Sequence, residues 1–162
     1  MIAQPVVSTS QLDFRTARKT KPIKAKPVHA VIPDVSVLDR FRLATLEGPQ
    51  RVKPDAWICQ GENGELWQQA AEKLTEKYHF GDSDAAGWIT LTPRADNAVN
   101  AAQVHGRQEG FAVRGQWGDE QPNGDLLQYG EEGDYVLQSK TDPDDVWIVK
   151  QDLFEATYDF AT

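Results

Sequence analysis

Residues 132–160, EGDYVLQSKTDPDDVWIVKQDLFEATYDF, contain the pattern from which the fold of this chain is best predicted. Two runs of β-branched and aromatic residues, 135–137 and 146–149, flank a polar segment that contains Pro143. Such runs favour strands, and a proline between them favours a turn. The pattern therefore predicts a β-hairpin with a longer connection. Asp152 can then cap a short helix.

The same pattern occurs upstream, in residues 54–80. Its turn is Asn63-Gly64 between apolar runs, which is the strongest short-range signal for a hairpin. The alignment needs only two extra residues in the downstream turn, where insertions are tolerated. Hairpin-then-helix units also recur in unrelated chains, and we favour an internal duplication over that explanation. The aligned pairs are Trp57 with Tyr135, Trp67 with Trp147, Leu74 with Phe154, Tyr78 with Tyr158, and Phe80 with Phe160.

The predicted fold class is α+β: antiparallel, hairpin-based sheets with short helices, in two related lobes packed as one body. We expect a basic N-terminal arm at 1–26, a first lobe at 27–80, a connector at 81–109 and a second lobe at 110–162. The arm lacks periodicity, so we expect it to be mobile and the body to fold without it. The hairpin predicted over 111–129 has no evident counterpart in the first lobe. The other predicted elements are strands at 25–32 and 88–92, a hairpin at 56–68, and helices at 35–46, 69–78 and 97–104.

Charge is unevenly spread along the chain, whose formal net charge is −8 at pH 7. Six basic residues against Asp13 alone make the arm positive, and the rest of the chain is acidic. An acidic body is a poor surface for nucleic acid, because phosphate contacts need clustered Lys and Arg. The arm alone could supply such contacts. It could also lie on an acidic partner, or on its own acidic body, which we favour.

Cys59 is the only cysteine among the 162 residues, which excludes an internal disulfide and suits a reducing compartment. Because it lies in an apolar strand, we expect a buried, inert thiol rather than a nucleophile. The apolar runs are too short to cross a bilayer, and the first residues lack a secretory pattern. We therefore expect a cytoplasmic protein without membrane contact.

The sequence contains no motif for a phosphate-binding loop, a zinc protease or a Cys/His metal cluster. We accordingly expect no cofactor and no metal. The carboxylates of Asp142, Asp144 and Asp145 are the one acidic concentration. If their loop met Asp82 and Asp84, the group could hold Mg²⁺ or Ca²⁺ through oxygen ligands. We favour a solvated turn.

Two histidines, His79 and His105, flank the predicted connector and could serve as an acid or base in a cleft between the lobes. His79 and the three aspartates of the acidic loop are the catalytic candidates that the sequence offers, and all four are weak. These residues leave open whether the chain is an enzyme.

Aromatic residues are numerous for so acidic a chain, with five Trp and four Tyr. We expect most of them in the core, where aromatic side chains contribute large buried areas. Trp57, Trp67, Tyr135 and Trp147 lie on the paired strands of the two lobes and are the candidate ligand-binding residues. If some of them face a cleft between the lobes, they would suit a flat ligand or a partner peptide.

Four short motifs occur in the chain: Gly133-Asp134-Tyr135, Val146-Trp147-Ile148-Val149, Phe154-Glu155-x-x-Tyr158 and Lys26-Pro27-x-x-Ala30. Together they resemble the PGDYG-type family of small bacterial and phage proteins. The chain departs from the family pattern at Glu132, where the family has Pro, and at Val136, where it has Gly. The resemblance implies a related fold and a bacterial or phage origin, and it implies no established activity.

We therefore favour a non-catalytic binding or interaction protein, encoded by a bacterium or a phage. It would engage a protein partner or a small ligand through aromatic residues between the lobes. The alternative is a small enzyme acting on a nucleotide-like or phosphorylated substrate. Clustered exposed aromatic residues would favour the first, and a concave pocket in which His and Asp side chains converge would favour the second.

Overall fold

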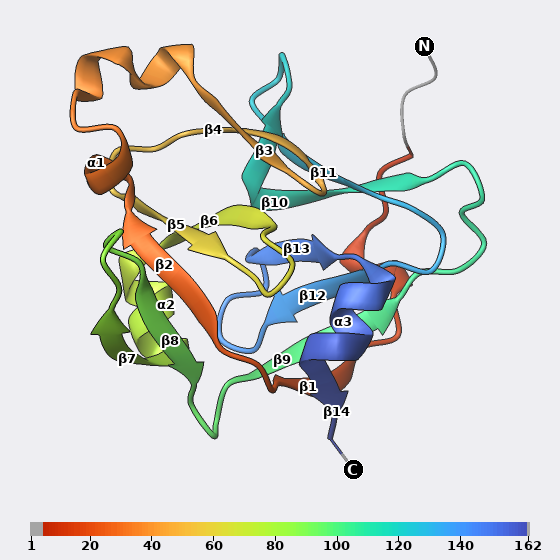
Figure 1. Cartoon of the computed structure of the whole chain (residues 1–162). Coiled ribbons are helices and arrows are strands. Elements are labelled where there is room, and N and C mark those ends of the chain that lie inside the picture. The colour runs from red at the N-terminus through yellow and green to blue at the C-terminus, as the bar shows by residue number, and fades with distance from the viewer. Residues whose placement is uncertain (1–4, 162) are drawn as a thin grey trace. The chain divides into compact units, whose positions relative to one another are not determined.

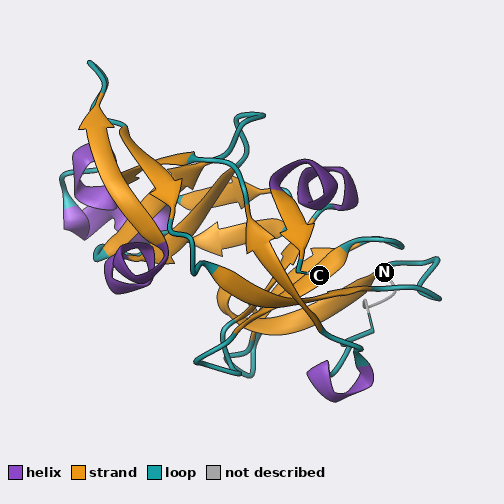
Figure 2. Cartoon of the chain, turned by 90° about the horizontal axis from the view of Figure 1, so that it is seen from below, coloured by secondary structure: helices purple, strands orange, loops and turns teal. Residues whose placement is uncertain are grey.

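Antiparallel β-sheets make up most of the structure, a computed structural model that describes residues 5–161 (Figure 1). A few short helices lie between the strands (Figure 2), so the predicted α+β class is confirmed. The chain falls into two units. Thr20–Asn97 forms the first, which we call the central unit. The chain before and after it, ending at Lys19 and resuming at Ala98, forms the second, which we call the terminal unit.

The central unit is built on a five-stranded antiparallel sheet. In sheet order its strands are β6 (Leu66–Ala70), β5 (Ala56–Gln60), β2 (Ile23–Pro27), β8 (Ile89–Pro93) and β7 (Tyr78–Ser83). Helix α2 (Ala71–Lys77) joins β6 to β7. A separate hairpin of β3 (Arg42–Thr45) and β4 (Gly48–Arg51) precedes β5. Between β2 and this hairpin lie α1 (Val28–Val31) and a 3₁₀ helix over Val35–Arg40.

The terminal unit is built on a second five-stranded antiparallel sheet. In sheet order its strands are β13 (Val146–Val149), β12 (Tyr135–Ser139), β9 (Ala98–Gln103), β1 (Arg15–Lys19) and β14 (Tyr158–Phe160). Helix α3 (Gln151–Thr157) joins β13 to β14. A separate hairpin of β10 (Phe111–Glu120) and β11 (Leu126–Gly130) precedes β12, and a 3₁₀ turn over Thr9–Gln11 precedes β1.

The helices α2 and α3 end in the same way. A tyrosine follows each of them in extended backbone, and its N–H closes the last turn: Tyr78 donates to the Leu74 carbonyl, and Tyr158 to the Phe154 carbonyl. Leu74 and Phe154 are also the residues that seat each helix, since both are buried in the core cluster of their own sheet. The hairpins and helices predicted around 56–78 and 135–158 are thereby confirmed.

Strand β12 shows how the terminal sheet uses both of its faces. Tyr135 and Leu137 lie in one apolar cluster with Phe154 of α3. Val136, between them, lies in a second cluster with Phe111 of β10. This division follows from the strand period, because successive side chains point to opposite faces. The sheet is therefore covered by α3 on one face and by the β10–β11 hairpin on the other.

The two sheets have the same strand order, position by position, and the same pairing registers. At one edge, Trp67 pairs with Cys59 as Trp147 pairs with Leu137. In the middle, Cys59 pairs with Ala25 as Leu137 pairs with Ala101. At the other edge, Phe80 pairs with Leu91 as Phe160 pairs with Ala17. The residues aligned from the sequence thus occupy corresponding places.

The first strand of each half of the chain belongs to the sheet of the other half. If the chain is divided into two consecutive halves, β1 to β7 and β8 to β14, then β1 lies between β9 and β14. In turn, β8 lies between β2 and β7. Each sheet therefore needs backbone hydrogen bonds from both halves, and neither half contains a complete five-stranded sheet.

The predicted N-terminal arm at 1–26 is wrong for the residues that the structure describes; residues 1–4 lie outside them. Strands β1 and β2 lie in the segment, and each has a strand on both sides. Ala17 and Ala25 are fully buried. The strand pattern is weak here because, apart from Ile23, the buried residues are small alanines between long basic side chains. Such side chains keep their charges in water while their stems lie along the protein.

The units differ from the predicted lobes and connector, because residues 81–109 contribute strands to both sheets. The helix predicted over 97–104 is β9, in which Val99 and Ala101 are buried on one face. Small residues do not separate the helical from the strand period well. Neighbours on both sides, β1 and β12, decide for the strand.

Three predictions around the first hairpin also need correction. The strand predicted over 25–32 ends at Pro27, and α1 begins at Val28. The helix predicted over 35–46 is a 3₁₀ helix that ends at Arg40 and is followed by β3. The hairpin predicted over 111–129 was expected to have no counterpart in the first lobe, and the β3–β4 hairpin is that counterpart. Its strands are short and carry exposed charged residues, so the alternating apolar pattern is weak there.

Cutting the chain between the two halves tests the exchange of strands. A protease site inserted between Ala85 and Ala86, in an exposed loop, would allow cleavage of the folded protein. We expect the two fragments to co-elute in size-exclusion chromatography and to separate only in denaturant, because β1 and β8 tie each fragment into the sheet of the other. Uncleaved protein is the control. Fragments that separate without denaturant would contradict the topology.

Candidate functional site

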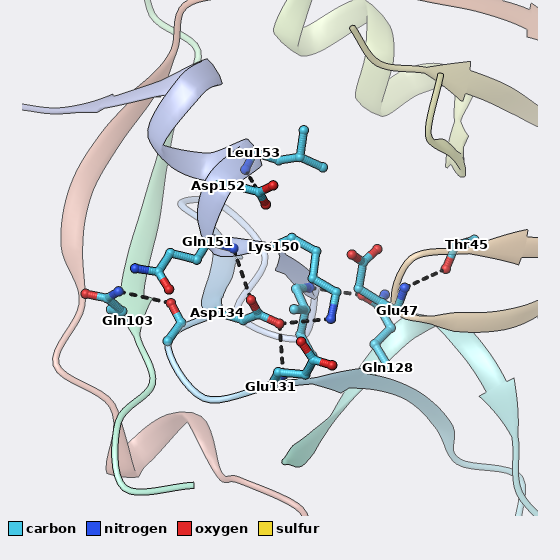
Figure 3. Close-up of polar contacts among 12 residues, drawn as sticks. Thr45, Glu47, Gln103, Gln128, Glu131, Asp134, Lys150, Gln151, Asp152 and Leu153 are labelled. Atoms are coloured by element: carbon cyan, nitrogen blue, oxygen red, sulfur yellow. Dashed lines mark hydrogen bonds and ion pairs between the residues drawn. The ribbon is translucent and has the colours of Figure 1, made fainter. Parts of the chain in front are cut away.

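Asp134, in the Gly-Asp-Tyr motif, is a buried carboxylate whose side chain accepts three hydrogen bonds (Figure 3). Its side chain is almost fully buried, and it follows a tight turn in which the Asp134 N–H donates to the Glu131 carbonyl over 3.0 Å. Gly133 precedes it with a φ of +90°, a conformation that glycine adopts without strain. A Cβ at Gly133 would meet only the end of the exposed, flexible Gln151 side chain, so the backbone conformation is the reason for glycine at this position.

Both oxygens of Asp134 are used to hold helix α3 and the turn. Oδ1 accepts from the Gln151 N–H at 3.0 Å, which is one of the otherwise unpaired donors at the start of α3. Oδ2 accepts from the Glu131 N–H at 2.8 Å and from Lys150 Nζ at 3.0 Å. Lys150 itself provides no side-chain cap for α3. The Asp134 carboxylate, just before β12, therefore caps helix α3, which follows β13. Its role is to position this helix.

The central unit has uncharged residues at the positions that correspond to Asp134 and Lys150. Ala56 and Ala70 pair with each other across β5 and β6 and occupy the places of Asp134 and Lys150. Helix α2 accordingly begins without a side-chain cap. A part-buried ion pair and an apolar pair at matched places are both compatible with this fold, as expected when the cost of desolvation offsets much of the attraction between the charges.

The acidic loop predicted as a catalytic or metal-binding candidate serves its own turn. Asp142 Oδ1 accepts from the Asp144 N–H at 3.1 Å, and Asp142 Oδ2 accepts from Gln116 Nε2 at 2.9 Å. Asp144 is exposed, whereas Asp145 is buried and its carbonyl accepts from the Ser139 N–H. The loop lies in the terminal unit, and Asp82 and Asp84 lie in the central unit.

The histidines are exposed and lie in different units. His79 is on β7 of the central unit, and His105 follows β9 in the terminal unit, 3.5 Å from Glu132. Within residues 5–161, no group of three or more His, Cys, Asp and Glu side chains is arranged to hold a metal ion. The four catalytic candidates are therefore not brought together around a common point within either unit.

The aromatic candidates belong to the cores of their units. Tyr135 is buried and stacks on Phe154 with 3.8 Å between ring centroids, and Phe154 stacks on Tyr158 at 5.0 Å. Trp147 is half-buried against this cluster, and burial raises the pKa of Tyr158. Tyr135 thus has no surface to offer a ligand.

In the central unit the two candidate tryptophans are half-buried. Trp57 meets Phe80 edge-to-face at 5.7 Å, and Trp57 and Trp67 both pack against the apolar cluster around Leu74. Cys59 lies in the same cluster and is fully buried, so the prediction of a buried thiol is confirmed. That these aromatic residues face a gap between lobes stays a prediction.

A set of exposed apolar side chains that the sequence did not predict occurs along residues 31–46 of the central unit, before and within the β3–β4 hairpin. Four large apolar side chains are exposed there: Val31, Val35, Phe41 and Leu46. Phe41 is 45% exposed and Val35 is 62% exposed. We call this set the apolar patch. The sequence signal was misleading, because Phe41 falls on the apolar face of the helix that was predicted over 35–46.

The matched position in the terminal unit is covered. Leu43 pairs with Gln50 as Val113 pairs with Gln128, and both glutamines are buried. When the two hairpins are aligned on these pairs, Phe41 corresponds to Phe111. Phe111 is fully buried in a cluster with Val7, with Leu12 and Phe14 packed against it.

The cover is the N-terminal segment, which adds a short parallel partner to β10. The Ala112 N–H donates to the Pro5 carbonyl and the Val7 N–H donates to the Ala112 carbonyl, each over 2.8 Å. In the central unit, within the part of the chain that the structure describes, β3 has β4 as its only strand partner. One hairpin is therefore covered at its outer edge and the other is open.

No protein-family model, no curated protein and no solved structure matches this chain. The resemblance to the PGDYG-type family therefore stays a prediction. Among the described residues, no helix has the length and apolar character needed to cross a membrane.

The Asp134–Lys150 pair can be tested against its apolar counterpart. Asp134→Ala leaves the part-buried Lys150 ammonium without its partner and the start of α3 without its cap, so we expect a loss of about 1–3 kcal/mol in the free energy of unfolding. The double variant D134A/K150A recreates the Ala56–Ala70 arrangement and should lose less than D134A alone. Urea unfolding measures both. A double variant less stable than D134A would contradict this interpretation.

The hydrogen bonds of Glu132 predict that the stability of the fold depends on pH. The Arg107 N–H donates to Glu132, and together with the Gly106 N–H and His105 it lowers the pKa of this carboxyl against the opposing effect of burial. A carboxyl with a lowered folded-state pKa stabilises the fold above its unfolded pKa of about 4.3 and loses that contribution as the pH falls through the folded value.

Glu132→Gln, which resembles the protonated acid, should therefore be less stable than the parent at pH 7. The difference should shrink as the pH is lowered through the carboxyl range. Chemical unfolding of both proteins along one pH series measures it. A difference that is constant with pH would show that the charge of Glu132 has no part in the stability of the turn.

Proposed function

We propose that this chain is a non-catalytic interaction protein that binds a protein partner through the apolar patch of the central unit. The observation that carries the proposal is the contrast between Phe41 and Phe111, which occupy matched positions and differ in cover. Exposed apolar side chains that gather on one segment favour a protein–protein contact. An aromatic side chain that becomes buried when the partner binds is also the kind of residue that contributes most to such a contact.

The charges of the protein are compatible with this proposal. Two of the buried or part-buried carboxylates, those of Asp134 and Asp142, accept hydrogen bonds that hold a helix and a turn. Catalytic acids and bases are instead expected to converge on a substrate position. The enzyme alternative, with a nucleotide-like or phosphorylated substrate, gains no support from the geometry of His79 or of the acidic loop.

We also infer that the two halves of the chain arose by duplication of one unit. The matched strand order and the matched registers of the two sheets support this origin. The equivalent glutamines support it further: Gln50 accepts from the Gln68 side chain of β6, and Gln128 accepts from the Ile148 N–H of β13. After such a duplication, loss of the cover from one hairpin would leave an apolar surface free to take a partner.

Affinity capture from an extract of the source cells tests the proposed function. The full chain serves as bait beside a double variant, Val35→Asp with Phe41→Asp, and beside His79→Ala as the control. His79 is exposed in the same unit and lies outside the patch. We expect the parent and H79A to retain the same bound proteins, and the double variant to lose them. Retention by all three baits would overturn the role of the patch.

A further inference from the structure

We propose that the outer edge of β3 is a docking site for an extended peptide segment of the partner protein, which adds to β3 as a parallel strand. The inference rests on the proposed function and specifies how the partner binds. The segment would be β-branched in the part that pairs with β3 and acidic beside it.

The backbone groups of β3 that face outward follow from the hydrogen-bond pattern of the hairpin. In an antiparallel pair, opposed residues alternate between those that exchange hydrogen bonds and those that do not. Pro49 lies opposite Ala44 and has no N–H to donate, so this pair is of the second kind. The pair Leu43–Gln50 is then hydrogen-bonded, and Arg42–Arg51 is not. Hence the N–H and C=O of Arg42 and Ala44 point away from β4.

The terminal unit shows what such an edge accepts. Ala112 corresponds to Arg42 by the register of the two hairpins, and its N–H and C=O bond to Pro5 and Val7. The segment runs parallel to β10 at this bridge. Val7 points into the cluster around Phe111 and is buried. A peptide on β3 would cover Phe41 in the same manner, and strand addition at an open edge is a common mode of peptide recognition.

Charge selects the segment that fits. Arg40 and Arg42 flank Phe41, and all three side chains are exposed. The Arg42 guanidinium donates to the Asp39 and Phe41 carbonyls, which holds its positive charge beside the edge. The chain as a whole is acidic, with a formal net charge of −8. An acidic side chain on the incoming segment would therefore meet favourable charge beside Phe41, and its binding would weaken with added salt.

The probe for the experiment is a synthetic peptide, Ac-PVVSTEE-amide, which combines the sequence of residues 5–9 with two glutamates. It is titrated into the ¹⁵N-labelled full chain, and a second peptide with two lysines in place of the glutamates is the charge control. We expect the acidic peptide to shift the amide signals of Arg42 and Ala44. The lysine peptide should bind about tenfold or more weakly, a difference of roughly 1.4 kcal/mol.

Two variants identify the edge and the patch. Ala44→Pro removes an outward donor without removing a bond to β4, and proline is tolerated in edge strands; it should abolish the shifts while the signals of the two five-stranded sheets keep their positions. Phe41→Ala should weaken binding about tenfold or more. Phe80→Ala, at an exposed aromatic residue of the same unit outside the patch, should leave binding unchanged.

Each other outcome overturns the proposal. Shifts confined to β10 and residues 5–7 would mean that the peptide replaces the native cover of the terminal unit. Concentration-dependent shifts of β3 without peptide would assign the edge to a second copy of this chain. If the peptide fails to bind while capture from the extract still depends on the patch, the proposed function stands and the strand-addition mode is wrong.

Discussion

The backbone hydrogen bonds of β1 and β8 are the constraint on which the rest of the structure depends. Each of these strands lies inside a five-stranded sheet and has a paired neighbour on both sides. Ala17 and Leu91, at matched places in them, are fully buried. Removing either strand would leave two strand edges unpaired inside a core, which is costly because buried N–H and C=O groups need partners. The fold of each unit is therefore conditional on chain from both halves.

The two units share the same strand order but differ in how the helix of each unit begins. The terminal unit fixes the start of its helix with a buried carboxylate and a lysine, whereas the central unit places two alanines there. An ion pair out of water gains Coulomb energy and loses hydration, so the polar and apolar solutions are closer in stability than their chemistry suggests. Asp134 is thus explained by positioning of α3, with no chemical reaction required.

The same comparison directs attention to the surface. Phe111 is buried under an N-terminal segment that Ala112 holds by two hydrogen bonds, and Phe41 has no such cover in the described chain. An apolar side chain is stabilised when it leaves water, and an open strand edge offers directional hydrogen bonds. The exposed Phe41 side chain and the open edge of β3 could therefore both be covered by an extended segment of another protein. This is the physical basis for proposing an interaction protein.

The sequence by itself determined the local elements: both hairpin-and-helix units, the buried Cys59 and the correspondence of Trp67 with Trp147 follow from strand runs, turn residues and spacing. It did not determine which strands become neighbours, because the small alanines of β1 and β9 carry little periodic signal. Only the tertiary structure placed β1 between β9 and β14, buried Tyr135 and left Phe41 exposed. The physical reason is that strand pairing and burial depend on residues far apart in the chain, whereas turn and helix signals are local.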